Sequence, residues 1–384
     1  MGSSAAMGGT AFGLRNSYQI NPFNPASYSA IDSMTFLMDF GIFSRHSVYE
    51  SSDKQNAGNE YNFHYLTFSF PLKKWWGTSF GLLPYASKGY DIVSSEGTGV
   101  ETVLTTIKGS GTLSKAYLGN SFMIGKNLSI GFNVWYMFGT LADSYYMKFP
   151  KDPSSYDYLQ VTGLNVRDVG ITTGLQYSVK TKKKGVFTFG AVFEPQQNLK
   201  SNYTKFEEQA LFRGSSTNTA IKDTISNIND KSSGLNLPLS IGAGVSYLFK
   251  GKLNLAADIY HQKWSSVTFL GNYPEFLTNS TRYSTGIEYT PDEYSIRSYW
   301  SRATYRAGGF YENSYMYING QQIKSYGLTM GLGLPIIRSL STFNFSAEVG
   351  RLGTTENDLI KESYLKFTFH FMIHDRWFFK RKFD

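Results

Sequence analysis

The chain has 384 residues and few charges, because Asp, Glu, Lys and Arg together make up 17% of it, whereas soluble domains usually carry about 25%. Aromatic residues make up a further 17%, with 28 Tyr and 30 Phe, and the formal net charge is +8. No stretch approaches the roughly 18 apolar residues of a membrane-spanning helix. The absence of cysteine excludes disulfides and thiolate catalysis. A large β-sandwich and a membrane β-barrel are the classes that remain.

The first 32 residues precede any regular pattern and are predicted to form a unit of their own. Pro22 and Pro25 stand three residues apart, which excludes a regular helix or strand around them. Residues 1–6 lack the apolar core of an export signal, so we expect the chain to be the mature form of an exported protein. The segment is predicted to be a compact plug or a periplasmic leader.

From residue 33 onward, apolar side chains alternate with small or polar ones, as in Leu128–Gly139. A β-strand sends successive side chains to opposite faces, so each segment has an apolar face that needs a cover. Nothing else in the chain supplies that layer, whereas a bilayer does. We therefore predict an all-β fold, a transmembrane antiparallel β-barrel of about 14 strands over residues 33–384. Its segments are Ser33–Ser44, Glu60–Leu72, Thr78–Ser94, Val100–Ile124, Leu128–Phe149, Tyr158–Lys180, Val186–Asn202, Asn236–Phe249, Leu253–Thr268, Thr281–Thr290, Ile296–Tyr311, Ile323–Pro335, Thr342–Gly353 and Leu359–Ile373.

The connections alternate between short turns, such as residues 125–127 and 250–252, and longer polar loops, of which Tyr203–Leu235 is the longest. Outer-membrane barrels have short periplasmic turns and longer external loops, so an even strand number predicts that both termini are periplasmic. Cations gather on the short turns. They either contact anionic lipid head groups or a periplasmic partner, or only keep the turns soluble. Nucleic acid is not an expected partner, because no basic stripe is interleaved with aromatics.

The third segment has a proline inside its strand pattern. Pro84 offers no N–H to a strand ladder, and Gly81 lies three residues before it. Proline in a sheet is confined to edges, ends and bulges. The barrel wall is therefore predicted to kink or part here, which makes Gly81 and Pro84 candidates for a lateral gap. The alternative is a simple bulge near a rim.

Seven charged residues share the less apolar face of their segments, which assigns them to the lumen. They are Asp39, Glu194, Asp258, Glu288, Arg302, Arg306 and Glu348. On the lipid face, an Arg or Lys near the midplane would cost roughly 2–4 kcal/mol. The group forms either the polar end of a ligand path or structural links between the wall and a plug.

Catalytic chemistry has little support in the sequence. There are five histidines, and neither a His-Glu-x-x-His nor a Gly-x-Ser-x-Gly motif is present. We predict that the protein is not an enzyme and that it holds no cofactor and no metal.

The N-terminal run Asn21-Pro22-Phe23-Asn24-Pro25-Ala26, after the small-residue opening Ser3–Thr10, resembles the start of the FadL family of outer-membrane proteins. Later stretches resemble the Bacteroidota branch of that family. They include Tyr117-Leu118-Gly119, Tyr305-Arg306-Ala307-Gly308, Asn319-Gly320-Gln321-Gln322 and Gly331-Leu332-Gly333-Leu334-Pro335.

The resemblance implies a 14-stranded barrel whose lumen is plugged by residues 1–32, with Asn21, Pro22, Asn24 and Pro25 in the plug. The family's transporters carry fatty acids or aromatic hydrocarbons and release them sideways through a gap at the third strand. We therefore expect transport of hydrophobic compounds across the bacterial outer membrane by lateral release. The alternative is a non-transporting accessory subunit, because other FadL-type barrels belong to the type IX secretion translocon or to the barrel-assembly machinery.

The partners expected are outer-membrane lipid and lipopolysaccharide, together with a hydrophobic ligand or an outer-membrane protein complex. The polar loop Tyr203–Leu235 contains many charged and amide side chains. Such a loop fits a capped surface or a docking surface somewhat better than a wide hydrophobic funnel.

Overall fold

The structure is a computed structural model, and it describes residues 2–97, 102–151, 155–182, 184–212, 219–230, 234–268, 274–337 and 339–377. The strands are β1 (Thr35–Glu50), β2 (Gln55–Lys73), β3 (Trp76–Gly97), β4 (Thr102–Ile124), β5 (Leu128–Lys148), β6 (Asp157–Lys180), β7 (Gly185–Glu194), β8 (Gln197–Phe212), β9 (Thr219–Asp230), β10 (Gly234–Leu237), β11 (Ser240–Phe249), β12 (Leu253–Gln262), β13 (Ser280–Tyr289), β14 (Thr304–Ile318), β15 (Gln321–Pro335), β16 (Thr342–Leu352) and β17 (Lys361–Arg376). The helices are short: α1 (Gly2–Ala5), η1 (Pro25–Ala30), η2 (Trp264–Ser266), α2 (Tyr299–Arg302) and η3 (Glu356–Asp358). No helix in the described ranges is long and apolar enough to cross a membrane.

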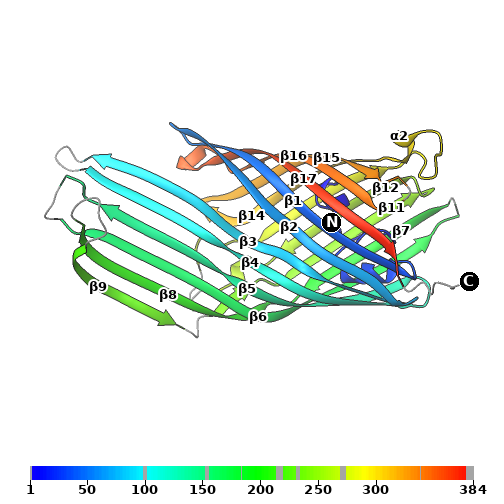
Figure 1. The fold of residues 1–384 in the computed structure, drawn as a ribbon, viewed down its shortest axis with the longest axis horizontal. Coiled ribbons are helices and arrows are strands. Elements are labelled where there is room, and N and C mark those ends of the chain that lie inside the picture. Colours follow the sequence, from blue (N-terminus) through cyan, green and yellow to red (C-terminus); the bar gives the residue numbers. More distant parts are fainter. Residues whose placement is uncertain are drawn as a thin grey trace, which may run out of the picture.

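Fourteen strands close into one antiparallel ring, which confirms the predicted barrel. The ring runs from β1 through β7, continues at β11 through β17, and closes where β17 pairs with β1. β8 and β10 extend β7 and β11 beyond a short interruption, and β9 folds back on β8. Figure 1 shows the closed wall and the strands that rise beyond it.

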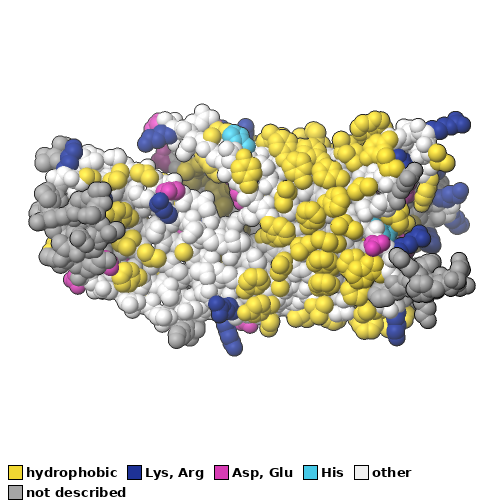
Figure 2. Space-filling view, in the orientation of Figure 1, with side chains coloured by type: hydrophobic (Ala, Val, Ile, Leu, Met, Phe, Trp, Pro, Cys, Tyr) yellow, Lys and Arg dark blue, Asp and Glu magenta, His cyan; other side chains and the backbone are white. Residues whose placement is uncertain are grey.

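The alternation in the sequence becomes an alternation of exposure in the wall. In β7, for example, Thr188 is buried whereas its neighbours Phe187 and Phe189 are exposed. Figure 2 shows apolar side chains gathered over the half of the wall that carries the short turns. This is the pattern of a lipid-facing band.

The wall is much taller on one side than on the other. β3 to β6 have 21 to 24 residues, whereas β11 to β13 have ten each. The outer parts of the tall strands form an open sheet in the order β3-β4-β5-β6-β8-β9, which we call the outer lobe. Its strands are Ala86–Gly97, Thr102–Leu113, Gly139–Lys148, Asp157–Val166, β8 and β9.

Two expectations about connections were wrong. Most of the described part of Tyr203–Leu235 is strand, because it holds the end of β8, all of β9 and the start of β10. Its polar residues do not exclude a strand, since both faces of an extramembrane hairpin meet water. The segment Ile296–Tyr311 begins with α2, and its strand starts only at Thr304.

Candidate functional site

The N-terminal segment, residues 2–31, lies within the barrel and bonds to strands around the ring. The Asp258 carboxylate on β12 accepts the backbone N–H groups of Ala11 (2.5 Å) and Phe12 (2.8 Å). Gln176 on β6 donates to the Phe12 carbonyl at 3.0 Å. Further bonds are Gly8 N–H to Thr329 Oγ1 (2.8 Å), Ser246 Oγ to Gly13 O (2.7 Å), Asn133 Nδ2 to Pro22 O (2.9 Å) and Ser121 Oγ to Ala26 O (2.8 Å). The segment therefore spans from β4 and β5 to β15.

The Asn-Pro-Ala motif folds the end of this segment. Asn24 is the N-cap of η1 and its Oδ1 accepts the Ala26 N–H at 3.1 Å. Pro25 occupies the first helical position, where its missing N–H costs nothing. The side chain of Asn24 also donates to the Phe12 carbonyl (2.8 Å), and Asn21 donates to the Ala11 carbonyl (2.6 Å). Both asparagines thus hold two parts of the segment together.

Glycines let the short side of the wall approach the segment. Gly286 and Gly308 face each other across β13 and β14. A Cβ on either residue would come within 2.5 Å of Met7 atoms. The close fit requires the glycines, since real Cβ atoms do not approach other atoms so closely.

Two of the predicted lumen acids are in ion pairs. Arg306 is buried and binds Glu288 (Nε to Oε2, 2.6 Å) and Asn344 (Nη1 to Oδ1, 2.8 Å). Glu194 pairs with Lys115 at 3.1 Å. Charges placed in this way satisfy one another away from bulk water.

Two other acids accept tyrosine hydroxyls. Tyr65 donates to Asp39 Oδ2 (2.8 Å), and Tyr364 donates to Glu348 Oε1 (2.7 Å). The Tyr65 hydroxyl also lies 2.8 Å from His370 Nδ1. The tyrosines, His370 and Lys115 were missed by sequence reasoning, because polar partners on different strands leave no spacing signal in one chain.

Arg302 is placed differently from the expectation. It lies on α2, before β14 begins, and its guanidinium stands 5.3 Å from the Tyr299 ring centroid. The alternation of a strand does not apply on a helix, so the reasoning that assigned Arg302 to the lumen was wrong.

The wall parts at the level of Pro84. β2 pairs with β3 only up to Leu66 and Leu82, and a bulge between Pro84 and Ala86 interrupts the pairing of β3 with β4. On β2, His64 is the extra residue of a second bulge against β1. A bulge bends a strand and re-aims its side chains. The two bulges therefore turn β2 and β3 away from each other, and Figure 2 shows the surface hollowed between them.

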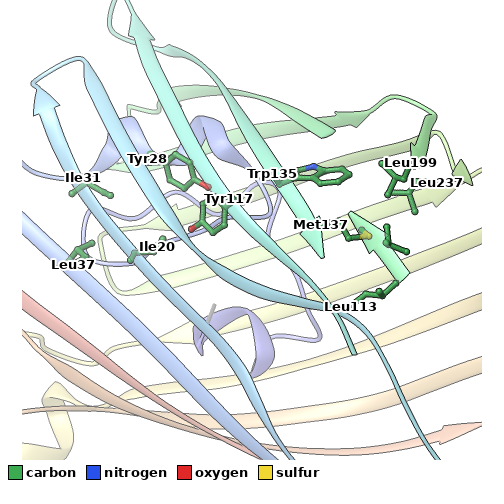
Figure 3. Packing of buried hydrophobic residues seen from close by; sticks show 11 residues of the cluster. Ile20, Tyr28, Ile31, Leu37, Leu113, Tyr117, Trp135, Met137, Leu199 and Leu237 are labelled. Atoms are coloured by element: carbon green, nitrogen blue, oxygen red, sulfur yellow. The ribbon is translucent and has the colours of Figure 1, made fainter. Parts of the chain in front are cut away.

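Packed side chains lie behind this opening. Leu83 and Ala86 contact a buried apolar cluster that extends from Tyr28 of the N-terminal segment to Met137 and Leu199 on the wall. Figure 3 shows members of this cluster, with Tyr28 on the N-terminal segment and Met137 and Leu199 on strands. The lumen beside Pro84 is thus lined by apolar side chains and by Lys115, the ladder partner of Leu83, with its ion pair to Glu194.

A second discontinuity lies between β6 and the junction of β7 and β8, which we call the seam. The ladder stops after Thr173 with Phe193 and resumes at Val166 with Ser201. The Gln197 amide bridges the interval, accepting from Ile171 N–H (3.0 Å) and donating to the Ile171 carbonyl (3.3 Å). The Asp168 carboxylate also accepts the Lys200 N–H across the seam at 2.8 Å, so side chains there replace backbone pairing.

The described part of the chain contains at least two hollows. One, of about 530 Å³, lies on the outer apolar wall and is lined by residues that include Leu255, Ala257 and Ile287. Another, of about 240 Å³, lies between β1 and β13 to β17 and includes Arg45 and Arg282. Both guanidiniums are engaged, with Glu362 (2.8 Å) and Glu312 (2.9 Å) respectively. Among the described residues, no three His, Asp or Glu side chains form a group that would hold a metal ion.

The closed antiparallel ring of 14 strands is a FadL-like β-barrel. The fold is similar to the toluene transporter TbuX of Ralstonia pickettii (15% identity over 97% of both chains, TM-score 0.65). It is also similar to the P. putida toluene transporter TodX (16% identity over 99% of both, TM-score 0.64) and to a Pseudomonas aeruginosa FadL homologue (12% over 98% of both, TM-score 0.62). At such low identity the likeness shows the fold alone.

The sequence matches the model of the BamG family over residues 2–384, so the chain belongs to the BamG family. The expected FadL-type fold is confirmed by the structural neighbours, whereas the family that the sequence matches is BamG and not FadL. Placement in the Bacteroidota branch stays a prediction. No curated protein matches the sequence.

Proposed function

We propose that this chain is a non-transporting subunit of an outer-membrane protein assembly, the barrel-assembly machinery. The observation that carries the proposal is the N-terminal segment, which binds strands from β4 to β15 through backbone and side-chain groups. A lumen fastened at so many points suits a rigid scaffold better than a passage. The family name BamG fits the same alternative.

In this proposal residues 1–32 act as a plug, with Asn21, Pro22, Asn24 and Pro25 folding it. The charges of the lumen (Asp39, Glu194, Asp258, Glu288, Arg306 and Glu348) link strands to one another and to the plug. The protein is an integral outer-membrane barrel. We place both termini in the periplasm, the outer lobe outside the cell, and lipid and lipopolysaccharide around the apolar band.

Co-purification under mild detergent tests this role. A tagged chain extracted from its own outer membrane should bring the components of the barrel-assembly machinery in fixed proportion. Depletion of the chain should lower the amounts of other outer-membrane barrels and leave the uptake of toluene and fatty acids unchanged. A chain that purifies alone, and whose loss abolishes such uptake, would refute the proposal.

Transport by lateral release is the second candidate, and the parted wall at Gly81 and Pro84 favours it. In this candidate, a ligand would pass from the lumen to the bilayer where β2–β3 pairing ends at Leu82. The chain has no cysteine, so Asn62→Cys and Ser87→Cys can be joined across the opening with a bis-maleimide. If the protein transports, this link should abolish uptake of labelled fatty acid into proteoliposomes, whereas the two single variants should retain it. Equal uptake with and without the link would rule out this route.

A further inference from the structure

The outer lobe is an open sheet, so it has two edges that the barrel does not close. One edge is β9, which pairs only with β8. The other is the outer part of β3, because β2 leaves β3 after Leu82. From Ala86 to Gly97, β3 pairs with β4 alone, and no described strand is hydrogen-bonded to its other side. About six backbone N–H groups, one at every second residue, therefore face away from the sheet.

The two edges differ in how they are protected against pairing. Natural edge strands carry bulges, prolines or outward charges that prevent another strand from adding. β9 has two register shifts against β8, at Glu207/Glu208 and at Ala210/Phe212. β3 keeps a constant register with β4 from Ala86 to Gly97 and has no proline there. The β3 edge is thus long and straight, and of these protective features it has only charged side chains.

Two of the three charged side chains on this edge, Lys88 and Asp91, are in ion pairs, and the third, Glu96, lies near its end. Lys88 binds Asp143 on the inner face (2.7 Å), and Asp91 binds Lys108 on the outer face (2.8 Å). The β-branched side chains between them remain exposed, with Ile92 53% and Val93 62% accessible. An added strand would therefore meet Tyr90 and Ile92 on one face and Val93 on the other. Such a surface favours an uncharged segment of alternating β-branched or aromatic residues.

The position of the edge limits what can occupy it. The outer lobe stands beyond the apolar band (Figure 2), so acyl chains do not reach it, and lipids offer no regular row of amides. The edge also borders the hollow between the β1–β2 hairpin and the lobe (Figures 1 and 2). The hairpin stands beside it and would obstruct a second barrel, whereas one extended peptide would fit.

We propose that the edge of β3 from Ala86 to Gly97 is a docking site for an extended segment of a partner protein, which adds to the outer lobe as one more strand. Main-chain hydrogen bonds would supply the binding, and Tyr90, Ile92 and Val93 would set the register. The inference rests on the proposed role as a subunit, because it names where a partner of the assembly binds.

Amide hydrogen exchange in native outer-membrane vesicles tests the site directly. The chain is measured there with its natural neighbours and, for comparison, purified in lipid nanodiscs. In nanodiscs, the edge-facing amides between Ala86 and Gly97 should exchange fast. In vesicles the same amides, one at every second residue, should slow by about a hundredfold, because strand addition protects only those that face the edge.

A matched pair of variants shows whether protection arises by strand addition. Val93→Lys places a natural edge-protecting charge on β3, and it should restore fast exchange in vesicles. Ile228→Lys makes the same change on β9, where Ile228 is 46% exposed, and it should leave β3 protected.

Fast exchange of the edge-facing amides in native vesicles would overturn the inference. Slow exchange in nanodiscs would also overturn it, because lipid would then be the cause of protection. Protection that grows with protein concentration in nanodiscs would overturn it as well, because a second copy of the chain would then occupy the edge. Protection in vesicles without co-purification of the barrel-assembly machinery would refute the proposed assembly and leave the docking site standing. Co-purification of the machinery together with fast exchange of the edge-facing amides would support the assembly and refute the docking site.

Discussion

The short side of the barrel and the outer lobe use the same antiparallel sheet in opposite ways. On the short side, ten-residue strands enclose the N-terminal segment, and glycines such as Gly286 and Gly308 bring the wall against Met7. In the lobe, longer strands leave the ring and end in two open edges. The same antiparallel pairing therefore produces both a wall that encloses a buried segment and a sheet with exposed edges.

The difference begins at one row of the sheet. Pro84, Ser114, Phe138 and Arg167 lie side by side across β3 to β6. The β2–β3 pairing ends just below this row, and the seam begins at it. Below the row the strands build a closed wall around a buried segment, and above it they form an independent sheet. Substitutions that remove contacts on the short side should thus lower the free energy of unfolding strongly. Comparable substitutions in the lobe should change it little.

The largest effect is expected at Arg306 on the short side. Arg306→Met leaves the carboxylate of Glu288 without its partner, and breaking a buried pair in this way costs about 3–5 kcal/mol. The Arg306 side chain is only 4% accessible. Urea unfolding in lipid vesicles, followed by tryptophan fluorescence, measures the loss. The double variant with Glu288→Met should recover most of it.

The matched control for Arg306 is in the lobe. Lys108→Met removes an ion pair whose two side chains are each 57% accessible, and exposed pairs contribute about 0–1 kcal/mol. Equal losses for Arg306→Met and Lys108→Met would contradict the contrast between the two regions.

The next effect concerns the fit between wall and N-terminal segment. Gly308→Leu would place atoms where Met7 and Gly8 lie. Overpacking of this kind costs about 1–3 kcal/mol, and it should displace the segment, which would raise conductance in planar bilayers and expose the segment to protease. Gly89→Leu in the lobe is the control, since nothing lies within 4 Å of a Cβ there. An unchanged conductance and protease pattern for Gly308→Leu would mean that the segment does not obstruct the lumen.

A smaller effect is expected at the seam. Gln197→Ala removes the amide that bonds both backbone groups of Ile171, so the loss should be about 1 kcal/mol. Amide exchange of Ile171 should accelerate, because that N–H loses its acceptor. Gln196→Ala is the neighbouring control, since Gln196 donates only to the distant Ser266 carbonyl (3.2 Å). Slow exchange of Ile171 in Gln197→Ala would show that the ladder, rather than the side chain, closes the seam.

The alternation of apolar and polar residues predicted the ring because each side chain of the wall faces either lipid or lumen. The prediction failed for strands that do not separate lipid from lumen. In the hairpin of β8 and β9 both faces meet water, so its polar residues were taken for a loop. The bulge at His64 beside the opening was not predicted, and only the register of β1 with β2 identifies it.

The candidate site was less predictable than the fold, because its contacts join residues far apart in the chain. Asp258 was assigned to the lumen from alternation, yet its bond to Ala11 spans 247 positions. Pro84 marked a break in the wall, but the extent of the parting depends on where β2 stops pairing. The pattern of a single sequence predicts to which face of the wall a side chain points. It does not identify the residue that the side chain contacts.

The smallest effect is expected in the lobe and depends on pH. Tyr90 donates to Asp143 Oδ1 at 2.6 Å, and this hydrogen bond to a carboxylate, together with some burial, raises the pKa of Tyr90 to about 12. An unfolded tyrosine ionises near pH 10. The contribution of Tyr90 to folding is therefore complete below about pH 10 and is lost as the pH rises toward 12.

Alkaline titration of tyrosinate absorbance, compared with Tyr90→Phe, isolates this group. Asp143→Asn should move its titration back toward pH 10, because the acceptor loses its charge. Since the Tyr90–Asp143 contact is exposed, water screens it and global unfolding should hardly change. A large global loss from Asp143→Asn would mean that the lobe and the barrel fold as one unit, which would remove the distinction between the two regions.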